Sequence, residues 1–189
     1  MDKKEIIDFL KDLIVIVLIV LFIRTFLAMP FQINGQSMYW SYYDKEFILV
    51  DRFSYRLWEP DRGDVIVFKP NISKEKKYFL KRIIAKWWDL VKISNWKVYI
   101  KKQTDTDYVE LNEEYLNNEN KWFTYVGPSK ESFIYALWEW QYFVLWDNRN
   151  HSTDSRECFS SCAIEWQTNF IEIKDITGKV LIDLWYFNF

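Results

Sequence analysis

An apolar run near the N-terminus restricts the fold of this chain more than any other feature. Leu13 to Ile23 contains no polar residue, and further apolar residues lie on both sides of it. A helix that crosses a membrane needs about 20 mostly apolar residues, and the segment 13–30 comes near that length. The pattern therefore predicts one transmembrane anchor over 13–30, with a cleaved secretory signal as the alternative.

Basic residues before this run indicate its orientation. Lys3, Lys4 and Lys11 precede it, and basic residues favour the cytoplasmic side of a membrane. We therefore expect residues 1–12 in the cytoplasm. Residues 31–189 would lie outside it, held at the cell membrane by a single pass.

After the run, the sequence is typical of a β protein. Seven short segments rich in β-branched and aromatic residues are separated by polar residues, Gly, Pro and Asn. They are Glu46–Val50, Asp64–Phe68, Tyr78–Ile84, Val91–Ile93, Lys97–Ile100, Gln141–Leu145 and Phe170–Ile173. No long segment with helical periodicity follows the anchor, so we expect a mainly β, antiparallel fold. The acidic stretch from Gln103 to Asn120 predicts a solvated excursion or an inserted β subdomain, the latter over about 92–140.

Charge and residue counts exclude two functional classes. The net charge is -2 at pH 7, so the chain lacks the basic field that holds nucleic acid. His151, Cys158 and Cys162 are its only histidine and cysteines, too few for a four-ligand Cys/His zinc site, and no metal is expected. Outside the cytoplasm the two cysteines could form a disulfide, with buried free thiols as the alternative.

Tryptophan and glycine occur in an inverted ratio. The chain has 11 Trp and 4 Gly, whereas glycine makes up about 7% of an average chain. Several Trp occupy places where turns favour glycine, such as Trp96 after Asn95. We therefore interpret many of them as glycine encoded by UGA, with an aromatic-rich protein as the alternative. The positions concerned are Trp58, Trp87, Trp88, Trp96, Trp138, Trp140, Trp146 and Trp166.

Four short motifs follow the anchor in a fixed order. They are Gly35-Gln-Ser37-Met38, Gly63-Asp64, Lys81-Arg82 and a box from Asp147 to Arg156. A pair such as Lys-Arg is common, but the box and the joint order are hard to meet by chance. On these residues the chain resembles the type I signal peptidase family. That family has glycine where this chain has Trp88, Trp96 and Trp146, which agrees with the recoding hypothesis.

The resemblance implies a serine endopeptidase with a Ser-Lys dyad and no cofactor. Ser37 would be the nucleophile, and Lys81 would act as its general base in the form of a neutral amine. Apolar neighbours could keep this amine neutral by lowering its pKa. The backbone N–H of Ser37 would stabilise the oxyanion that forms during the reaction.

Supporting roles follow from the same resemblance. Ser152 would orient the lysine amine, and Asp154 and Arg156 would brace the box that Asp147 opens. His151 occupies a variable position of the family and is expected to take no part in catalysis.

The partners implied by the resemblance are signal-peptide-bearing preproteins and the lipid bilayer. The end of the signal peptide would bind as an added β-strand, with Ile33, Met38 and Tyr78 lining pockets for small residues. Two departures stand out, because Gly35 supplies no hydroxyl to the oxyanion and Trp40 replaces a proline of the family. Two alternatives therefore stay open: an inactive membrane-tethered β module that binds peptides, and a self-cleaving Ser-Lys regulator.

Overall fold

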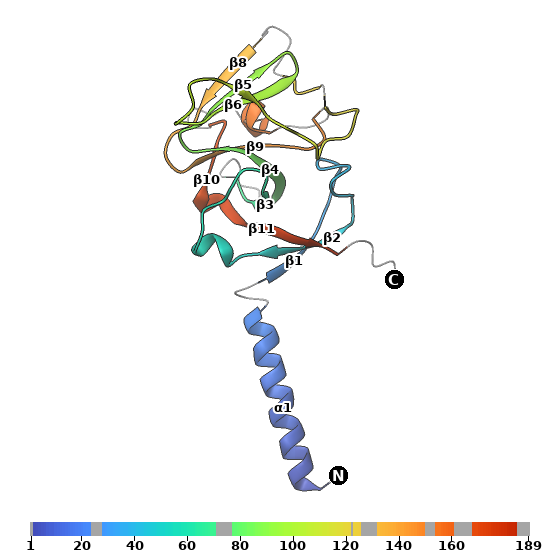
Figure 1. The fold of residues 1–189 in the computed structure, drawn as a ribbon. Helices are drawn as coiled ribbons and strands as arrows, with labels where there is room; N and C mark the ends of the chain where they lie inside the picture. Colours follow the sequence, from blue (N-terminus) through green and yellow to red (C-terminus); the bar gives the residue numbers. More distant parts are fainter. Residues whose placement is uncertain are drawn as a thin grey trace.

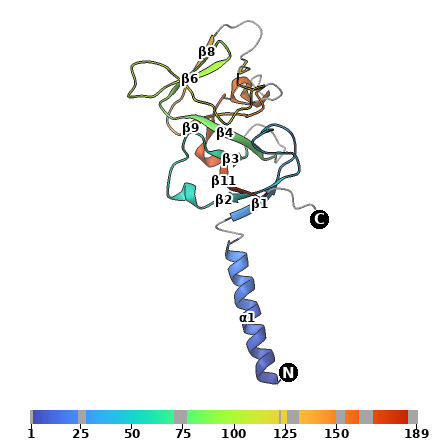
Figure 2. The same cartoon turned by 45° about the vertical axis from the view of Figure 1, so that its right-hand side comes forward.

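The protein is mainly β, with one N-terminal helix that projects from a β body (Figure 1, Figure 2). The structure is a computed structural model. It describes residues 2–23, 28–70, 77–121, 123–125, 132–149, 154–160 and 168–184.

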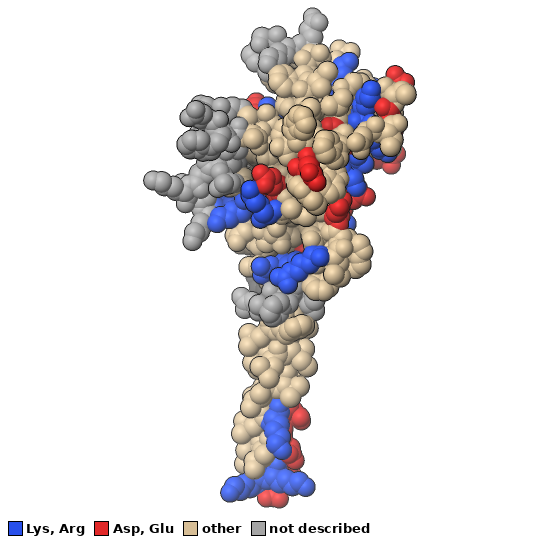
Figure 3. All heavy atoms as spheres, turned by 90° about the vertical axis from the view of Figure 1, so that its left-hand side faces the viewer, with Lys and Arg blue, Asp and Glu red and all other residues tan. Residues whose placement is uncertain are grey.

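The helix α1 (Lys3–Phe22) begins earlier than the sequence pattern predicted. The Glu5 carboxylate accepts a hydrogen bond from the Asp2 backbone N–H at 2.8 Å, which satisfies one of the free donors at a helix start. All of its side chains are exposed, and the charged ones gather at its N-terminal end (Figure 3). The C-terminal end of the expected anchor, 13–30, also differs from the structure. The helix α1 ends at Phe22, and residues 28–30 belong to a β-strand.

Among the residues that the structure describes, no helix combines the length and the apolar character that a membrane span requires.

Seven strands form a larger antiparallel sheet, in which the strand order is β1-β2-β11-β3-β4-β9-β10. Each strand is short, and the longest two have eight residues. The bounds in sheet order are β1 (Ala28–Gln32), β2 (Phe47–Asp51), β11 (Ile176–Asp183), β3 (Val65–Phe68), β4 (Phe79–Lys86), β9 (Gln141–Leu145) and β10 (Ile171–Glu172). Within the described residues, short 3-10 segments lie in the connections at Ser54–Arg56, Ser155–Ser160 and Ile173–Asp175, and a kink interrupts the second of these.

A second antiparallel sheet has four strands and lies at the end of the body away from α1 (Figure 1). Its strands in order are β7 (Val109–Glu110), β6 (Lys97–Lys101), β5 (Leu90–Ser94) and β8 (Ser132–Ala136). All four lie between β4 and β9 in the sequence, so this sheet is an excursion from the larger one. It occupies the region in which a solvated excursion or an inserted β subdomain was expected.

All seven predicted β segments contain strands, with ends that shift by a few residues. Four strands were not predicted, namely β1, β7, β8 and β11. The segment of β11 alternates poorly in polarity because its pairing with both neighbours is irregular, with register shifts near Gly178 and Val180. Gly178 is needed there, because a Cβ at this position would lie 2.1 Å from the backbone oxygen of Asp51.

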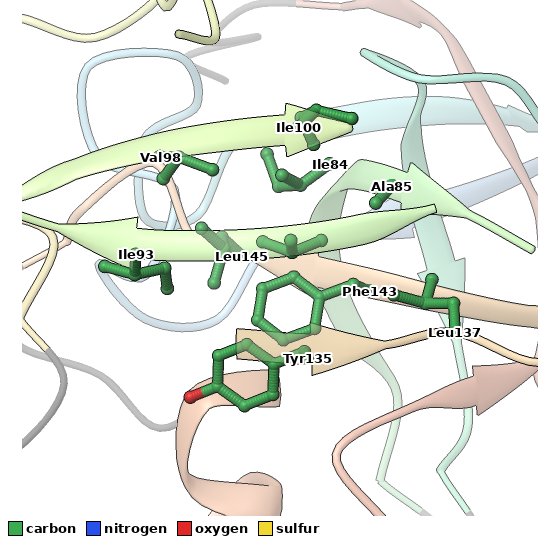
Figure 4. Close-up of a cluster of buried hydrophobic side chains, with 10 residues drawn as sticks. Ile84, Ala85, Ile93, Val98, Ile100, Tyr135, Leu137, Phe143 and Leu145 are labelled. Carbon is green, nitrogen blue, oxygen red and sulfur yellow. The ribbon is translucent and has the colours of Figure 1, made fainter. Parts of the chain in front are cut away.

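The two sheets share a hydrophobic core (Figure 4). Ile84 and Ala85 of β4 meet side chains of β5, β6, β8 and β9 there, while Ile83 packs into a second core with Phe68 and Val144. The register of β4 against β9 shifts between Ile83 and Ala85, and such a bulge redirects consecutive side chains. Strand β4 is therefore held by two cores at once, which fixes the position of the residues that precede the bulge.

Candidate active site

Ser37 lies in the loop between β1 and β2, and hydrogen bonds close the base of this loop. The backbone N–H of Ile33 donates to the carbonyl of Glu46 at 2.8 Å. Gly35 donates its N–H to Asp44 Oδ1 at 2.6 Å. The φ of Gly35 is +116°, a conformation that residues with a Cβ rarely adopt. Glycine at this position therefore lets the chain turn toward Ser37.

Asn148 binds the backbone carbonyl of Ser37 and that of the residue before it. Its N–H donates to the Ser37 carbonyl at 3.0 Å, and its side-chain amide donates to the Gln36 carbonyl at 3.0 Å. The sulfur of the next residue, Met38, accepts a hydrogen bond from the backbone N–H of Asp147 at 3.5 Å. Sequence reasoning missed Asn148 as a site residue, although it lies inside the motif box directly after Asp147.

Lys81 lies on β4 and is buried, with only 1% of its surface exposed. Its amine donates a hydrogen bond to the Leu80 carbonyl at 3.0 Å. Within the described part of the chain, no carboxylate lies within ion-pair distance of the amine. Burial lowers the pKa of Lys81 well below its ordinary value of 10.5, and the more distant negative charge of Asp154 opposes this shift only in part.

Ser37 and Lys81 line the same cleft, which has a volume of about 630 Å³. The cleft is mostly apolar, and it opens between the β1–β2 loop and the start of β4. Its other lining residues include Phe31, Ile33, Tyr78, Leu80 and Trp146.

Two of the three expected substrate-binding residues, Ile33 and Tyr78, line this cleft, and the third does not. Met38 is buried beneath the loop, with 1% of its surface exposed, and packs against the motif box instead. The residue after the serine thus anchors the loop, because its long apolar side chain points inward.

Trp146 stands over the lysine amine. The centroid of its ring lies 3.7 Å from Lys81 Nζ, and the ring of Phe79 lies 5.0 Å from the same atom. From the sequence this position was only a suspected glycine, and a ring at this place in the cleft was not foreseen.

The motifs that surround the dyad are joined through Arg82 and Asp147. Arg82 donates to Asp147 from Nε at 2.9 Å and from Nη2 at 2.6 Å, and to the Gly63 carbonyl from Nη1 at 2.9 Å. The Ser41 hydroxyl donates to Asp147 Oδ2 at 2.5 Å. Asp147, predicted as a supporting residue, therefore ties the serine loop to β4. Arg82 was missed in that role, although it directly follows Lys81 in the motif.

Asp154 and Arg156 form a buried, bidentate ion pair. Nε and Nη2 of Arg156 donate to the two carboxylate oxygens at 2.8 and 2.9 Å. Arg156 also donates to the carbonyls of Tyr125 and Arg149, at 3.0 and 3.2 Å. The pair thus braces the motif box. Ser152 and His151 lie outside the described residues.

Arg149 is fully buried and links the box to the excursion between β7 and β8. Its side chain pairs with Glu113 and donates to Thr124 Oγ1 at 2.9 Å. Its backbone N–H donates to Asn120 Oδ1 at 2.8 Å. Nothing in the sequence distinguishes Arg149 from an exposed arginine except its place in the box.

Cys158 is buried and disulfide-bonded. Of the two alternatives for this residue, a disulfide and a buried free thiol, the structure has the disulfide. Cys162 lies outside the described residues.

This arrangement fits nucleophilic catalysis of acyl transfer. A serine hydroxyl is a weak nucleophile that needs a base nearby. A buried amine with a lowered pKa can supply that base, because it can be neutral where a solvated lysine is charged.

Comparison with known proteins agrees with this chemistry. The chain matches the family model described as signal peptidase, peptidase S26, over residues 6–185. It is similar to signal peptidase I S of Bacillus subtilis strain 168, with 31% identity over 159 residues, 82% of this chain and 80% of that protein. It is also similar to signal peptidase IB of Staphylococcus aureus strain COL, with 27% identity over 190 residues, 98% of this chain and 93% of that protein.

Among solved structures, a signal peptidase I from Enterococcus faecalis V583 matches with 25% identity and a TM-score of 0.45, covering 66% of this chain and 98% of that structure.

Family and site together define a hydrolase of the serine endopeptidase class. More narrowly, the chain belongs to peptidase family S26, among the type I signal peptidases.

Proposed function

We propose that this protein removes N-terminal signal peptides from exported preproteins, with Ser37 as the nucleophile and Lys81 as the general base. The observation that carries the proposal is the position of Lys81. It is buried, lacks a carboxylate partner among the described residues, and opens onto the cleft that Ser37 lines. A lysine with a purely structural role would pair with an acid or reach solvent.

The reaction would proceed in two halves. Neutral Lys81 takes the hydroxyl proton of Ser37 while Oγ bonds to the scissile carbonyl carbon. The oxyanion that forms is stabilised by the N–H of Ser37. The C–N bond then breaks, the leaving amine takes the proton from Lys81, and an acyl-enzyme remains. Lys81 then takes a proton from a water molecule, whose oxygen bonds to the acyl carbon. The bond from that carbon to Ser37 Oγ breaks, Lys81 returns the proton to Oγ, and the signal peptide leaves with a free carboxyl group.

Asn148 and Asp147 would keep the serine loop in place during both halves. The backbone on each side of Ser37 is tied to Asn148, and the turn after it is tied to Asp147 through Ser41. We also propose Ser152 as the hydroxyl that orients the Lys81 amine, on the basis of the sequence box alone.

Substrate would bind in the cleft as an added strand. The apolar lining from Phe31, Ile33 and Leu80 suits small apolar side chains, and β1 lies at one edge of the seven-stranded sheet. A strand edge offers unpaired backbone groups to an extended peptide.

We propose that the N-terminal segment tethers the protein to the lipid bilayer, with residues 31–189 outside the cytoplasm. Support comes from the exposed side chains at the end of α1 and at Ile23, the residue that follows it, which are apolar without interruption from Leu13 to Ile23. Water disfavours so much exposed apolar surface. Carbonate extraction of membranes should leave the full-length protein in the pellet, and its release into the supernatant would contradict the tether.

Cleavage of a preprotein that ends its signal peptide in Ala-x-Ala tests the catalytic proposal. Ser37→Ala and Lys81→Ala should each abolish cleavage. Ser132→Ala and Lys174→Ala are matched controls on exposed positions far from the cleft in the sequence, and should cleave like the parent. Cleavage that survives in either dyad variant would contradict the proposed dyad. Binding without cleavage by the folded parent would favour a peptide-binding module.

A further inference from the structure

Four tryptophans occupy the third position of a tight turn. Trp40 lies in the turn from Met38 to Ser41, which a hydrogen bond of 3.0 Å closes, and Trp88 in the turn from Lys86 to Asp89, with a bond of 3.1 Å.

Of the other two turns, one leads into β9 and the other joins β5 to β6 as a hairpin. Trp140 lies in the turn from Trp138 to Gln141, closed by a bond of 3.2 Å. Trp96 follows Asn95 in the two-residue loop between the paired residues Ser94 and Lys97.

All four residues have a positive φ. The values are 79° for Trp40, 64° for Trp88, 65° for Trp96 and 64° for Trp140. In this region a Cβ crowds the neighbouring carbonyl oxygen, so bulky residues are rare and glycine is favoured. A turn whose third residue has a positive φ ordinarily carries glycine there.

The hairpin between β5 and β6 gives the sharpest case. Asn95 has a φ of 50° and Trp96 a φ of 65°. Positive values at both central residues define a type I′ turn, for which Asn-Gly is the preferred pair. Asn95 fits its position, whereas the residue that follows has the conformation of a glycine.

Packing does not compensate for this strain. The exposed fractions of the four residues lie between 43% for Trp88 and 50% for Trp96. A side chain of about 250 Å² normally dominates a core when it is buried. These four indoles instead stand at the surface, where each contacts another aromatic ring, namely Tyr39, Trp138, Tyr125 and Trp87 for Trp40, Trp88, Trp96 and Trp140. None of the four belongs to a buried hydrophobic cluster of the described residues.

We propose that Trp40, Trp88, Trp96 and Trp140 are glycine in the protein that its own cells make, because UGA codons are read there as glycine. The inverted ratio of Trp to Gly and the conformation of these turns are independent observations with this one explanation. Trp40 joins the positions suspected from the sequence. Among the suspected positions that the structure describes, Trp58, Trp87, Trp138 and Trp146 have no positive φ, so the turn conformation gives no support for glycine there.

Position 146 would also be glycine if its codon is UGA. What this change would do to the cleft rests on the proposed function. The Trp146 ring lies over Lys81 Nζ, and its Nε1 is buried without a hydrogen-bond partner in the described residues. Such a buried donor is costly. Glycine at 146 would remove this donor, enlarge the cleft and leave the amine open to the serine hydroxyl and the substrate.

Peptide sequencing by tandem mass spectrometry of the protein purified from its own cells tests the proposal directly, beside the sequence of its gene. We expect UGA at codons 40, 88, 96 and 140, and glycine in the corresponding peptides. Tryptophan at these positions, or UGG codons, would overturn the proposal. Neither result depends on catalytic activity, so failure here and failure of the proposed function are distinguishable.

Variants of the full-length protein in detergent test the conformational argument by itself. One variant replaces the four tryptophans by glycine and a second replaces them by alanine, which removes the indoles equally but keeps a Cβ. We expect the glycine variant to have the higher midpoint of thermal unfolding, by at least about 2 °C per site. At Trp58 and Trp138, the matched controls, alanine should equal or exceed glycine. Equal midpoints at the four turn positions would contradict the strain argument.

Discussion

Two neighbouring residues of β4 show how this fold separates catalysis from support. Lys81 and Arg82 point to opposite faces of the strand, since successive side chains alternate. Arg82 is bidentate with Asp147, and although burial alone would lower its pKa, the hydrogen bonds and charge of that carboxylate raise it. Lys81 is buried more deeply and has no carboxylate partner within the described residues, so its pKa is lowered. One cation therefore stays charged and structural, while the other can be a neutral base.

The largest expected effect is the loss of activity in Lys81→Met. Removal of the base should lower kcat/KM by about 10³-fold or more. The same change should raise the midpoint of thermal unfolding, because a buried amine without a charge partner costs free energy and methionine does not. Steady-state kinetics and thermal unfolding check the two parts. A stability loss would show that Lys81 is structural, as Arg82 is.

Arg82→Met should have the opposite effect on stability and should lower the free energy of unfolding. It leaves Asp147 buried without its cation, and breaking a buried pair costs about 3–5 kcal/mol. Denaturant unfolding measures the cost. The double variant Arg82→Met/Asp147→Leu should recover part of the lost stability, because no unpaired charge then stays buried. If Arg82→Met unfolds like the parent protein, the ion pair does not hold the serine loop.

The pH dependence should distinguish the two cations further. Protonation of Lys81 removes the base, so kcat/KM should rise about tenfold per pH unit below the pKa of this amine and then level off. Between that pKa and the ordinary value of 10.5, the unfolded chain binds more protons at Lys81 than the folded chain. Stability should therefore increase with pH through this window and decrease as the pH falls. Lys81→Met should lack this contribution, and Arg82 should add none.

The smallest effect concerns the ring over the amine. Trp146→Gly should raise kcat/KM, by about tenfold or less, because the indole covers Lys81 Nζ in the cleft. Trp58→Gly, at an exposed position outside the cleft lining, is the control and should leave kcat/KM unchanged. Lower activity of a folded Trp146→Gly protein would show that the ring assists the base.

Sequence patterns predicted the parts of this molecule that depend on local chemistry. The β segments with clear turns, such as Lys97–Ile100 after Asn95, were found because hairpin geometry is encoded in neighbouring residues. Strand β11 was missed, because irregular pairing hides its alternation. Ser37 and Lys81 could be named from a motif, and the structure brings both to one cleft.

Contacts between distant segments were harder to foresee. Arg149 pairs with Glu113, and Asn148 holds Ser37, across separations that only the folded chain closes. Met38 was assigned to the cleft, and its inward direction follows from the packing of the loop on the motif box rather than from its polarity. Residues in the box were visible in the sequence, but which of them pair and which face the cleft was not.

The protonation state of Lys81 decides whether this residue can act as a base, and nitrogen NMR of the lysine side chains measures it directly. In ¹⁵N-lysine-labelled Ser37→Ala protein, the Nζ signal of Lys81 is the one missing from the Lys81→Met variant. We expect this signal to titrate well below 10.5, because burial keeps the amine neutral. Titration at or above 10.5 would contradict a neutral base at this site and would leave the serine without its proposed partner.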